Sequence, residues 1–97
     1  MKLYKVYEIL DNTEEKLDSY PTYFVGAFKE EINAIQLCQA IDIADCNSTK
    51  IVYDEIVRGD IEDLYIYGLK NIDFEAAQEL KKLVKIYEKE NKNNLEK

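Results

Sequence analysis

The chain has 97 residues, which is enough for one small domain, and it carries a formal net charge of −7 with eight tyrosines and no histidine. The missing histidine removes the commonest general base and the commonest metal ligand. A single arginine among many carboxylates argues against a nucleic-acid surface, and no apolar run is long enough to span a bilayer. The first residues hold no continuous apolar segment of the signal-peptide kind, so we expect a cytoplasmic protein.

Two strands open the predicted fold. Residues 2–10 are rich in Tyr, Val, Ile and Leu with polar residues interspersed, and residues 22–28 are aromatic and β-branched. Residues 11–21 are polar and hold the only proline, which indicates a long loop. Gly26 within the second strand is typical of a bulge or a close backbone approach. We expect the two strands to pair antiparallel.

A helix is predicted over residues 30–44, with two glutamates in its first turn, where they suit the positive end of the helix dipole. After a polar break, residues 50–57 predict a third strand. Residues 61–68 are ambiguous. Their alternating Leu-Tyr-Ile-Tyr favours a strand, whereas Asp60 could cap a short helix that Gly68 would end. We prefer the strand.

The last element gives the clearest pattern. Asp73 is a good N-cap, and apolar residues recur at helical spacing as far as about Asn91, opposite a lysine-rich side. We therefore expect residues 1–91 to form a single domain, followed by a frayed polar tail over residues 92–97. The predicted class is α+β, with a small antiparallel sheet, the element order β-β-α-β-β-α, and two helices packed on one face.

Residues able to do covalent chemistry are scarce. The serines have no histidine to activate them, and Cys38 and Cys46 lack the basic neighbours that would activate a thiol. The three glycines are too widely spaced to cradle a phosphate. The sequence therefore predicts no enzyme activity, no catalytic residue, no cofactor and no metal.

Carboxylates gather in the second half of the chain. Oxygen ligands suit Mg²⁺ and Ca²⁺, but the spacing of these carboxylates does not match the calcium-loop pattern. The remaining interpretations are a solvated strand end and turn, or an acidic surface that binds a basic protein. The group consists of Asp54, Glu55, Asp60, Glu62 and Asp63.

The predicted first helix carries apolar residues on two sides. At about 100° per residue, Ile32, Ile35 and Ile43 lie opposite the face that can pack on the sheet. This second stripe is covered either by the last helix or by another molecule, which is a protein partner or a second copy of the chain. The tyrosines of the predicted strands either pave the sheet or form a binding face. The sheet-facing side consists of Ala34, Leu37, Cys38, Ile41 and Ala44.

A short acidic chain with the pairs Asp54-Glu55 and Glu62-Asp63 resembles the small proteins of bacteriophages and mobile elements, anti-CRISPR proteins among them. The resemblance covers the general character of the whole chain and assigns no individual residue. It implies a non-enzymatic module, an inhibitor or adaptor, that occludes a basic surface of a host protein such as a nucleic-acid-binding protein. Two alternatives stay open: a homodimeric structural or regulatory domain, and a small carboxylate-based metal protein or enzyme.

Overall fold

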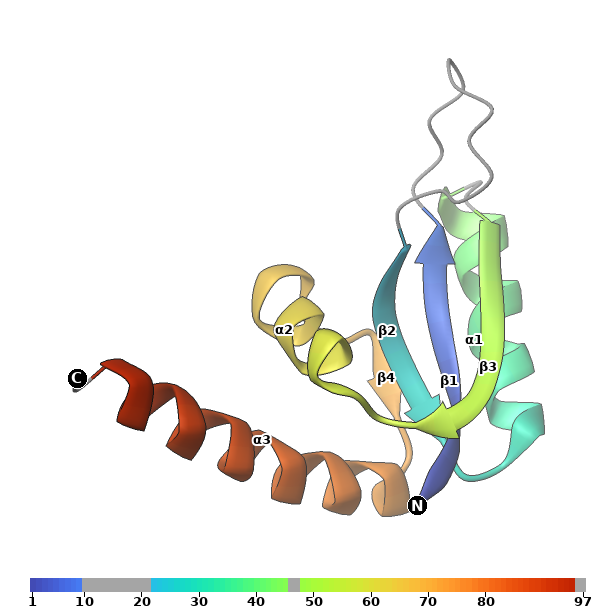
Figure 1. Cartoon of the computed structure of the whole chain (residues 1–97). Coiled ribbons are helices and arrows are strands. Elements are labelled where there is room, and N and C mark those ends of the chain that lie inside the picture. The colour runs from blue at the N-terminus through green and yellow to red at the C-terminus, as the bar shows by residue number, and fades with distance from the viewer. Residues whose placement is uncertain (10–21, 46–47, 96–97) are drawn as a thin grey trace.

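The protein folds around a four-stranded sheet (Figure 1), and the computed structural model describes residues 1–9, 22–45 and 48–95. The sheet has the order β3-β1-β2-β4. Strand β1 pairs antiparallel with β2 and β3, whereas β4 runs parallel to β2, so the sheet is mixed. The elements are β1 (Lys2–Ile9), β2 (Thr22–Phe28), α1 (Glu31–Asp45), β3 (Ser48–Glu55), α2 (Arg58–Tyr67), β4 (Asn71–Ile72) and α3 (Phe74–Leu95).

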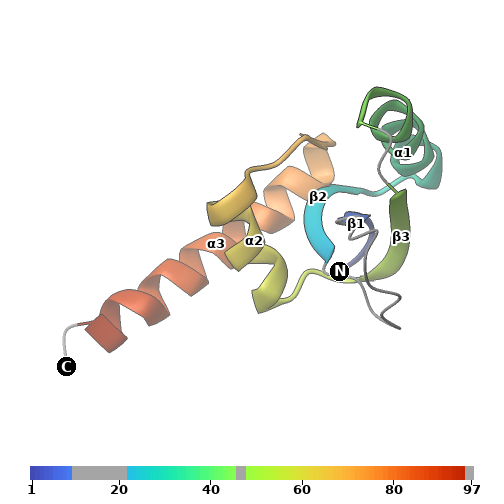
Figure 2. The ribbon, with the colours of Figure 1, turned by 90° about the horizontal axis from the view of Figure 1, so that it is seen from above.

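The predicted α+β class is confirmed, but the predicted arrangement is wrong in three respects. Three helices are described rather than two, and the sheet is mixed rather than antiparallel. The helices also lie on both sides of the sheet, with α1 on one face and α2 and α3 on the other (Figure 2). Each face has its own hydrophobic cluster, and Leu3 and Phe24 are central to the α2/α3 side while Val6 and Val25 are central to the α1 side.

Residues 58–67 form helix α2, where we expected a strand. Ile61 and Leu64 lie three residues apart on the side that packs into the α2/α3 cluster. The Asp60 carboxylate accepts the N–H of the N-cap residue Val57, and Gly68, at φ 80°, donates its N–H to the Leu64 carbonyl at 3.0 Å. These local signals at both ends of the segment favour a helix, and the packing of Ile61 and Leu64 against the sheet decides between the helix and the strand.

A bulge in β2 shifts the alternation of its side chains, so that Phe24 and Ala27, three residues apart, lie on the same side of the sheet. Val6 pairs with Gly26 and Tyr7 with Phe24, which leaves Val25 as the extra residue. Beyond the bulge Ala27 packs on the α2/α3 side. The glycine is required because a Cβ at position 26 would lie 2.6 Å from the Asn71 carbonyl oxygen of β4. The bulge and the close backbone approach that the sequence offers as alternatives for this glycine are both present.

Helix α3 begins as predicted. Asp73 accepts the N–H of Ala76 at 2.9 Å through Oδ1, and its Oδ2 accepts the N–H of Lys29 at 2.8 Å. Ala76 and Leu80 are buried in the hydrophobic cluster on the α2/α3 side of the sheet. The helix continues to Leu95, past the end that the sequence indicates. Among the described residues, no helix is both long and apolar enough to cross a membrane.

Candidate functional site

The predicted acidic group is not a single surface. Asp54 and Glu55 are exposed at the end of β3, and Glu62 is exposed on α2. Asp60, in contrast, is only 3% exposed. Asp63 is half-buried, and it accepts the N–H of Phe24 at 3.1 Å. Asp60 therefore holds the fold together and does not belong to an exposed acidic surface, and Asp63 contributes to such a surface only in part.

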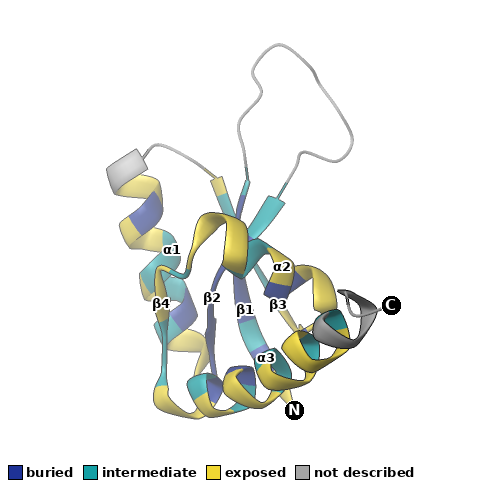
Figure 3. Ribbon diagram, turned by 90° about the vertical axis from the view of Figure 1, so that its left-hand side faces the viewer, coloured by how far each residue is buried: buried dark blue, intermediate teal, exposed yellow. Residues whose placement is uncertain are grey.

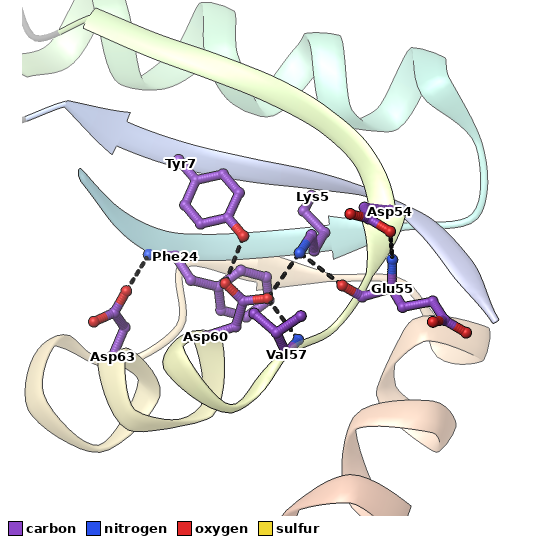
Figure 4. A network of polar contacts seen from close by, with 8 residues as sticks. All are labelled: Lys5, Tyr7, Phe24, Asp54, Glu55, Val57, Asp60 and Asp63. Atoms are coloured by element: carbon purple, nitrogen blue, oxygen red, sulfur yellow. Dashed lines mark hydrogen bonds and ion pairs between the residues drawn. The ribbon is translucent and has the colours of Figure 1, made fainter. Parts of the chain in front are cut away.

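Asp60 is the centre of a buried polar network (Figure 4). Lys5, which is also 3% exposed, donates from Nζ to Asp60 Oδ2 at 2.9 Å and to the carbonyl of Glu55 at 2.7 Å. Asp60 Oδ2 accepts the N–H of Val57 at 2.9 Å as well. The other oxygen, Oδ1, accepts the hydroxyl of Tyr7 at 2.5 Å. Both carboxylate oxygens are thus used inside the protein.

This network fixes the first turn of α2 against the sheet. A buried charge is tolerated when it is paired and hydrogen-bonded, and Lys5 and Asp60 meet that condition together. The Lys5 contact with Glu55 adds the end of β3 to the same network. We interpret the pair as a positioning device for α2, because both oxygens of Asp60 and two of the three N–H groups of Lys5 are already bonded within the protein.

Tyr7 is held as a neutral phenol. Partial burial, followed by the hydrogen bond to Asp60, raises the pKa of Tyr7 far above its ordinary value. An unfolded tyrosine ionises near pH 10, so the network stabilises the fold fully below about pH 10 and loses this contribution as the pH rises towards the folded-state pKa. Tyr7 is therefore a hydrogen-bond donor in this site and not a base.

We expect a spectroscopic titration to identify this phenol. Wild-type protein and Tyr7→Phe should release the same number of phenolates at alkaline pH while they stay folded, because Tyr7 does not ionise in the native state. In denaturant the wild type should release one phenolate more than Tyr7→Phe. A difference of one phenolate between the two folded proteins would show instead that the hydroxyl of Tyr7 titrates freely.

A second buried carboxylate secures the other end of α2. Glu8 is 2% exposed, accepts the hydroxyl of Tyr23 and forms a 3.0 Å ion pair with Lys70. The ring of Tyr23 stacks on Tyr67, the last residue of α2, with 4.4 Å between ring centroids. The short helix is therefore fixed at its start through Asp60 and at its end through this stack.

The outward side of α2 carries the exposed residues that we call the α2 ridge (Figure 3). Glu62 and Ile66 lie one turn apart on it, and Ile66 is 70% exposed. Each flanking tyrosine is more than half exposed while its ring contacts the body of the protein, since Tyr65 stacks on Tyr87 at 5.7 Å. Partial burial, and then the neighbouring carboxylate of Glu88, raise the pKa of Tyr65. The ridge consists of Glu62, Tyr65, Ile66 and Tyr67.

The isoleucine stripe of α1 lies apart from this ridge. Ile43 is 83% exposed and Ile32 is more than half exposed, whereas Ile35 is half-buried. Helix α3 lies on the opposite face of the sheet, so it does not cover the stripe (Figure 2). The sheet-facing side of α1 is as predicted, because Ala34 and Ile41 are buried there. Ala44 and Cys46 of the sequence analysis fall outside the described side chains.

A cavity of about 360 Å³ opens between α1 and β4, where Asn33, Gln36 and Asn71 supply polar groups. Asp73 is its one carboxylate, and both of its oxygens already accept backbone N–H groups. Within the described part of the chain, no group of three or more His, Cys, Asp or Glu side chains could hold a metal ion.

Fold and site together define a small α+β protein whose one short helix is fixed at both ends and exposes an acidic and aromatic ridge. Comparison with family models, with curated proteins and with solved structures found no match.

Proposed function

We propose that this protein is a non-enzymatic binding module that docks on another protein through the α2 ridge. The observation that supports this most is the run of three exposed apolar side chains, Tyr65, Ile66 and Tyr67, on a ten-residue helix. Large aromatic and aliphatic side chains that stay exposed on one short helix are typical of protein interfaces.

The way α2 is held makes it suited to binding. Its first turn is fixed by the buried pair of Lys5 and Asp60, and its last residue is fixed by the stack of Tyr67 on Tyr23. A rigid surface loses little conformational entropy when a partner docks. The buried charges would then serve binding indirectly, because they order the helix that carries the ridge.

The chemistry of the ridge indicates a basic partner. Glu62 lies on the ridge and Glu88 lies beside Tyr65, while the whole chain carries a net charge of −7. Such a surface suits a lysine- and arginine-rich groove, as on a nucleic-acid-binding protein, with the carboxylates near the positions that phosphates would take. The protein would act as an inhibitor or adaptor by occluding that groove.

Affinity capture with matched baits tests the proposal. Wild-type protein is used to capture partners from a lysate of the organism that carries the gene, at low and at high salt. We expect Ile66→Ser and Glu62→Lys to recover at least about tenfold less partner, in keeping with the loss of a hot-spot contact. The recovery by wild type should also fall steeply with salt.

The controls lie on α1, across the sheet from the ridge. Ile43→Ser removes an even more exposed isoleucine, and Glu31→Lys makes the same charge reversal in another helix. Both should recover as much partner as the wild type. Loss of capture with Ile43→Ser and not with Ile66→Ser would move the binding surface to α1 and overturn the proposal.

A further inference from the structure

The outer edge of β3 is a long strand edge that no described element covers. β3 has eight residues and pairs with β1 along its whole length without a register shift. It contains no proline. It forms one edge of the sheet, and the two-residue β4 forms the other edge. An edge of this length exposes a row of unpaired backbone N–H and C=O groups that can pair with another strand.

We propose that this edge pairs with the β3 of a second copy, in an antiparallel dimer whose two-fold axis passes through Val52. The inference goes beyond the proposed function, because α2 contacts β2 and lies away from β3. A dimer formed in this way keeps both α2 ridges exposed and continues one sheet through both copies.

The sequence of β3 is self-complementary in this register. Lys50 lies opposite the Asp54 of the second copy, so two Lys–Asp pairs form by symmetry. Ile51 lies opposite Tyr53, and Val52 lies opposite itself, which gives β-branched and aromatic pairs. An axis at Ile51 or at Tyr53 would instead place Val52 opposite Lys50 or Asp54. The axis at Val52 is therefore the one that pairs apolar with apolar and base with acid.

The side chains involved point to the correct faces. Ile51 packs into the α1-side cluster, and Tyr53 lies on the same face against Tyr4, with 4.5 Å between ring centroids. Lys50 lies on the other face, where its Nζ is 5.8 Å from the ring centre of Tyr7. Among the described residues, Lys50 and Asp54 form no ion pair. Asp54 accepts the N–H of Glu55 at 2.7 Å through Oδ1, and its Oδ2 can accept from the Lys50 of the second copy.

The half-buried Ile35 of α1 lies at the same level as Val52. Helix α1 runs antiparallel to β3 beside it (Figure 1), and Asp42 accepts the hydroxyl of Thr49 at 3.3 Å. Ile35 lies seven residues, or nearly two helical turns, before Asp42, and Val52 lies three residues after Thr49. Each of these spans is about 10 Å along its element. Ile35 also shares the β3-side flank of the helix with Asp42, because seven residues make nearly two whole turns. The two copies of Ile35 would therefore face each other at the axis.

Charge reversal tests the register. In sedimentation equilibrium, wild-type protein should reach twice the monomer mass of 11.4 kDa as its concentration rises. Lys50→Asp and Asp54→Lys should each weaken self-association about tenfold, because each places like charges opposite each other at two symmetric positions. The double variant Lys50→Asp/Asp54→Lys should restore it, and Glu62→Lys should leave it unchanged. Circular dichroism checks that each variant is folded.

Disulfide trapping tests the axis itself. In a background with Cys38→Ala and Cys46→Ser, oxidation should link Val52→Cys into a covalent dimer, because the two Cα atoms lie opposite each other. Thr49→Cys should not link to itself, since the two copies of position 49 lie about 20 Å apart in this register. A wild type that stays monomeric at the highest concentration overturns the proposal. So does a dimer that both charge reversals leave intact, or one that traps through position 49 and not through position 52.

Discussion

Replacing Asp60 with alanine is expected to lower the free energy of unfolding by about 3–5 kcal/mol. The substitution leaves the ammonium group of Lys5 buried without its counter-ion, and it also removes the acceptor for the hydroxyl of Tyr7 and for the N–H of Val57. A small domain has only about 5–15 kcal/mol of stability, so the variant should be close to unfolding at room temperature. Urea denaturation followed by circular dichroism measures the change.

Two further variants separate the charge effect from simple loss of contacts. Asp60→Leu combined with Lys5→Met removes both charges and should recover much of the lost stability, because no unpaired ion is then buried. Glu62→Ala deletes an exposed carboxylate two residues away and should change stability by less than about 0.5 kcal/mol. If Asp60→Ala cost no more than Glu62→Ala, the pair of Lys5 and Asp60 would not hold α2 in place.

Gly26→Ala is expected to destabilise the protein by about 3 kcal/mol, because it overpacks a buried site. The added Cβ would lie 2.6 Å from the Asn71 carbonyl oxygen and 2.7 Å from Leu37 Cδ2. The first of these neighbours is backbone and cannot turn aside, so β4 must move away from β2. Loss of amide hydrogen-exchange protection at Lys70, whose N–H donates to the Val25 carbonyl at 2.9 Å, would report that movement directly.

The matched control is Gly59→Ala. Nothing lies within 4 Å of a Cβ at position 59, and the residue is in α2, so alanine there should raise stability by up to about 1 kcal/mol. If the two alanine variants had the same stability, the close approach at Gly26 would not constrain the sheet.

The sequence was sufficient for the elements whose signals are local. Strands β1, β2 and β3 and helices α1 and α3 follow from apolar periodicity, and Asp73 caps α3 as its position indicates. The boundaries moved by a few residues, as with β3, which begins at Ser48 and ends at Glu55. Strand β4 was not predicted, because two residues show no periodicity and its pairing depends on the neighbouring β2.

Helix α2 shows where local pattern is insufficient. Its alternating tyrosines favour a strand, yet the burial of Ile61 and Leu64 decides the outcome and depends on the sheet beneath them. The ridge was missed for the same reason, since Tyr65 and Tyr67 on a strand would share one face. The signal that could have revealed it was the pairing of an acidic first turn with Gly68, which the strand pattern overrode.

Only one partner of the buried ion pair, Lys5, could be placed from the sequence. Lys5 lies two residues from both Leu3 and Tyr7, so the strand period places its side chain on the buried face. The sequence offers several carboxylates as its partner, and only the fold selects Asp60. This is why Asp60 was grouped with exposed acids, although its chemistry is that of a structural ion pair.

The central claim is that the protein acts through the α2 ridge, and titration calorimetry of one pair of variants tests it most directly. With the captured partner as titrant, Ile66→Ser should bind at least about tenfold more weakly than wild type, while Ile43→Ser should bind with wild-type affinity. Equal affinities for Ile66→Ser and wild type would contradict the account.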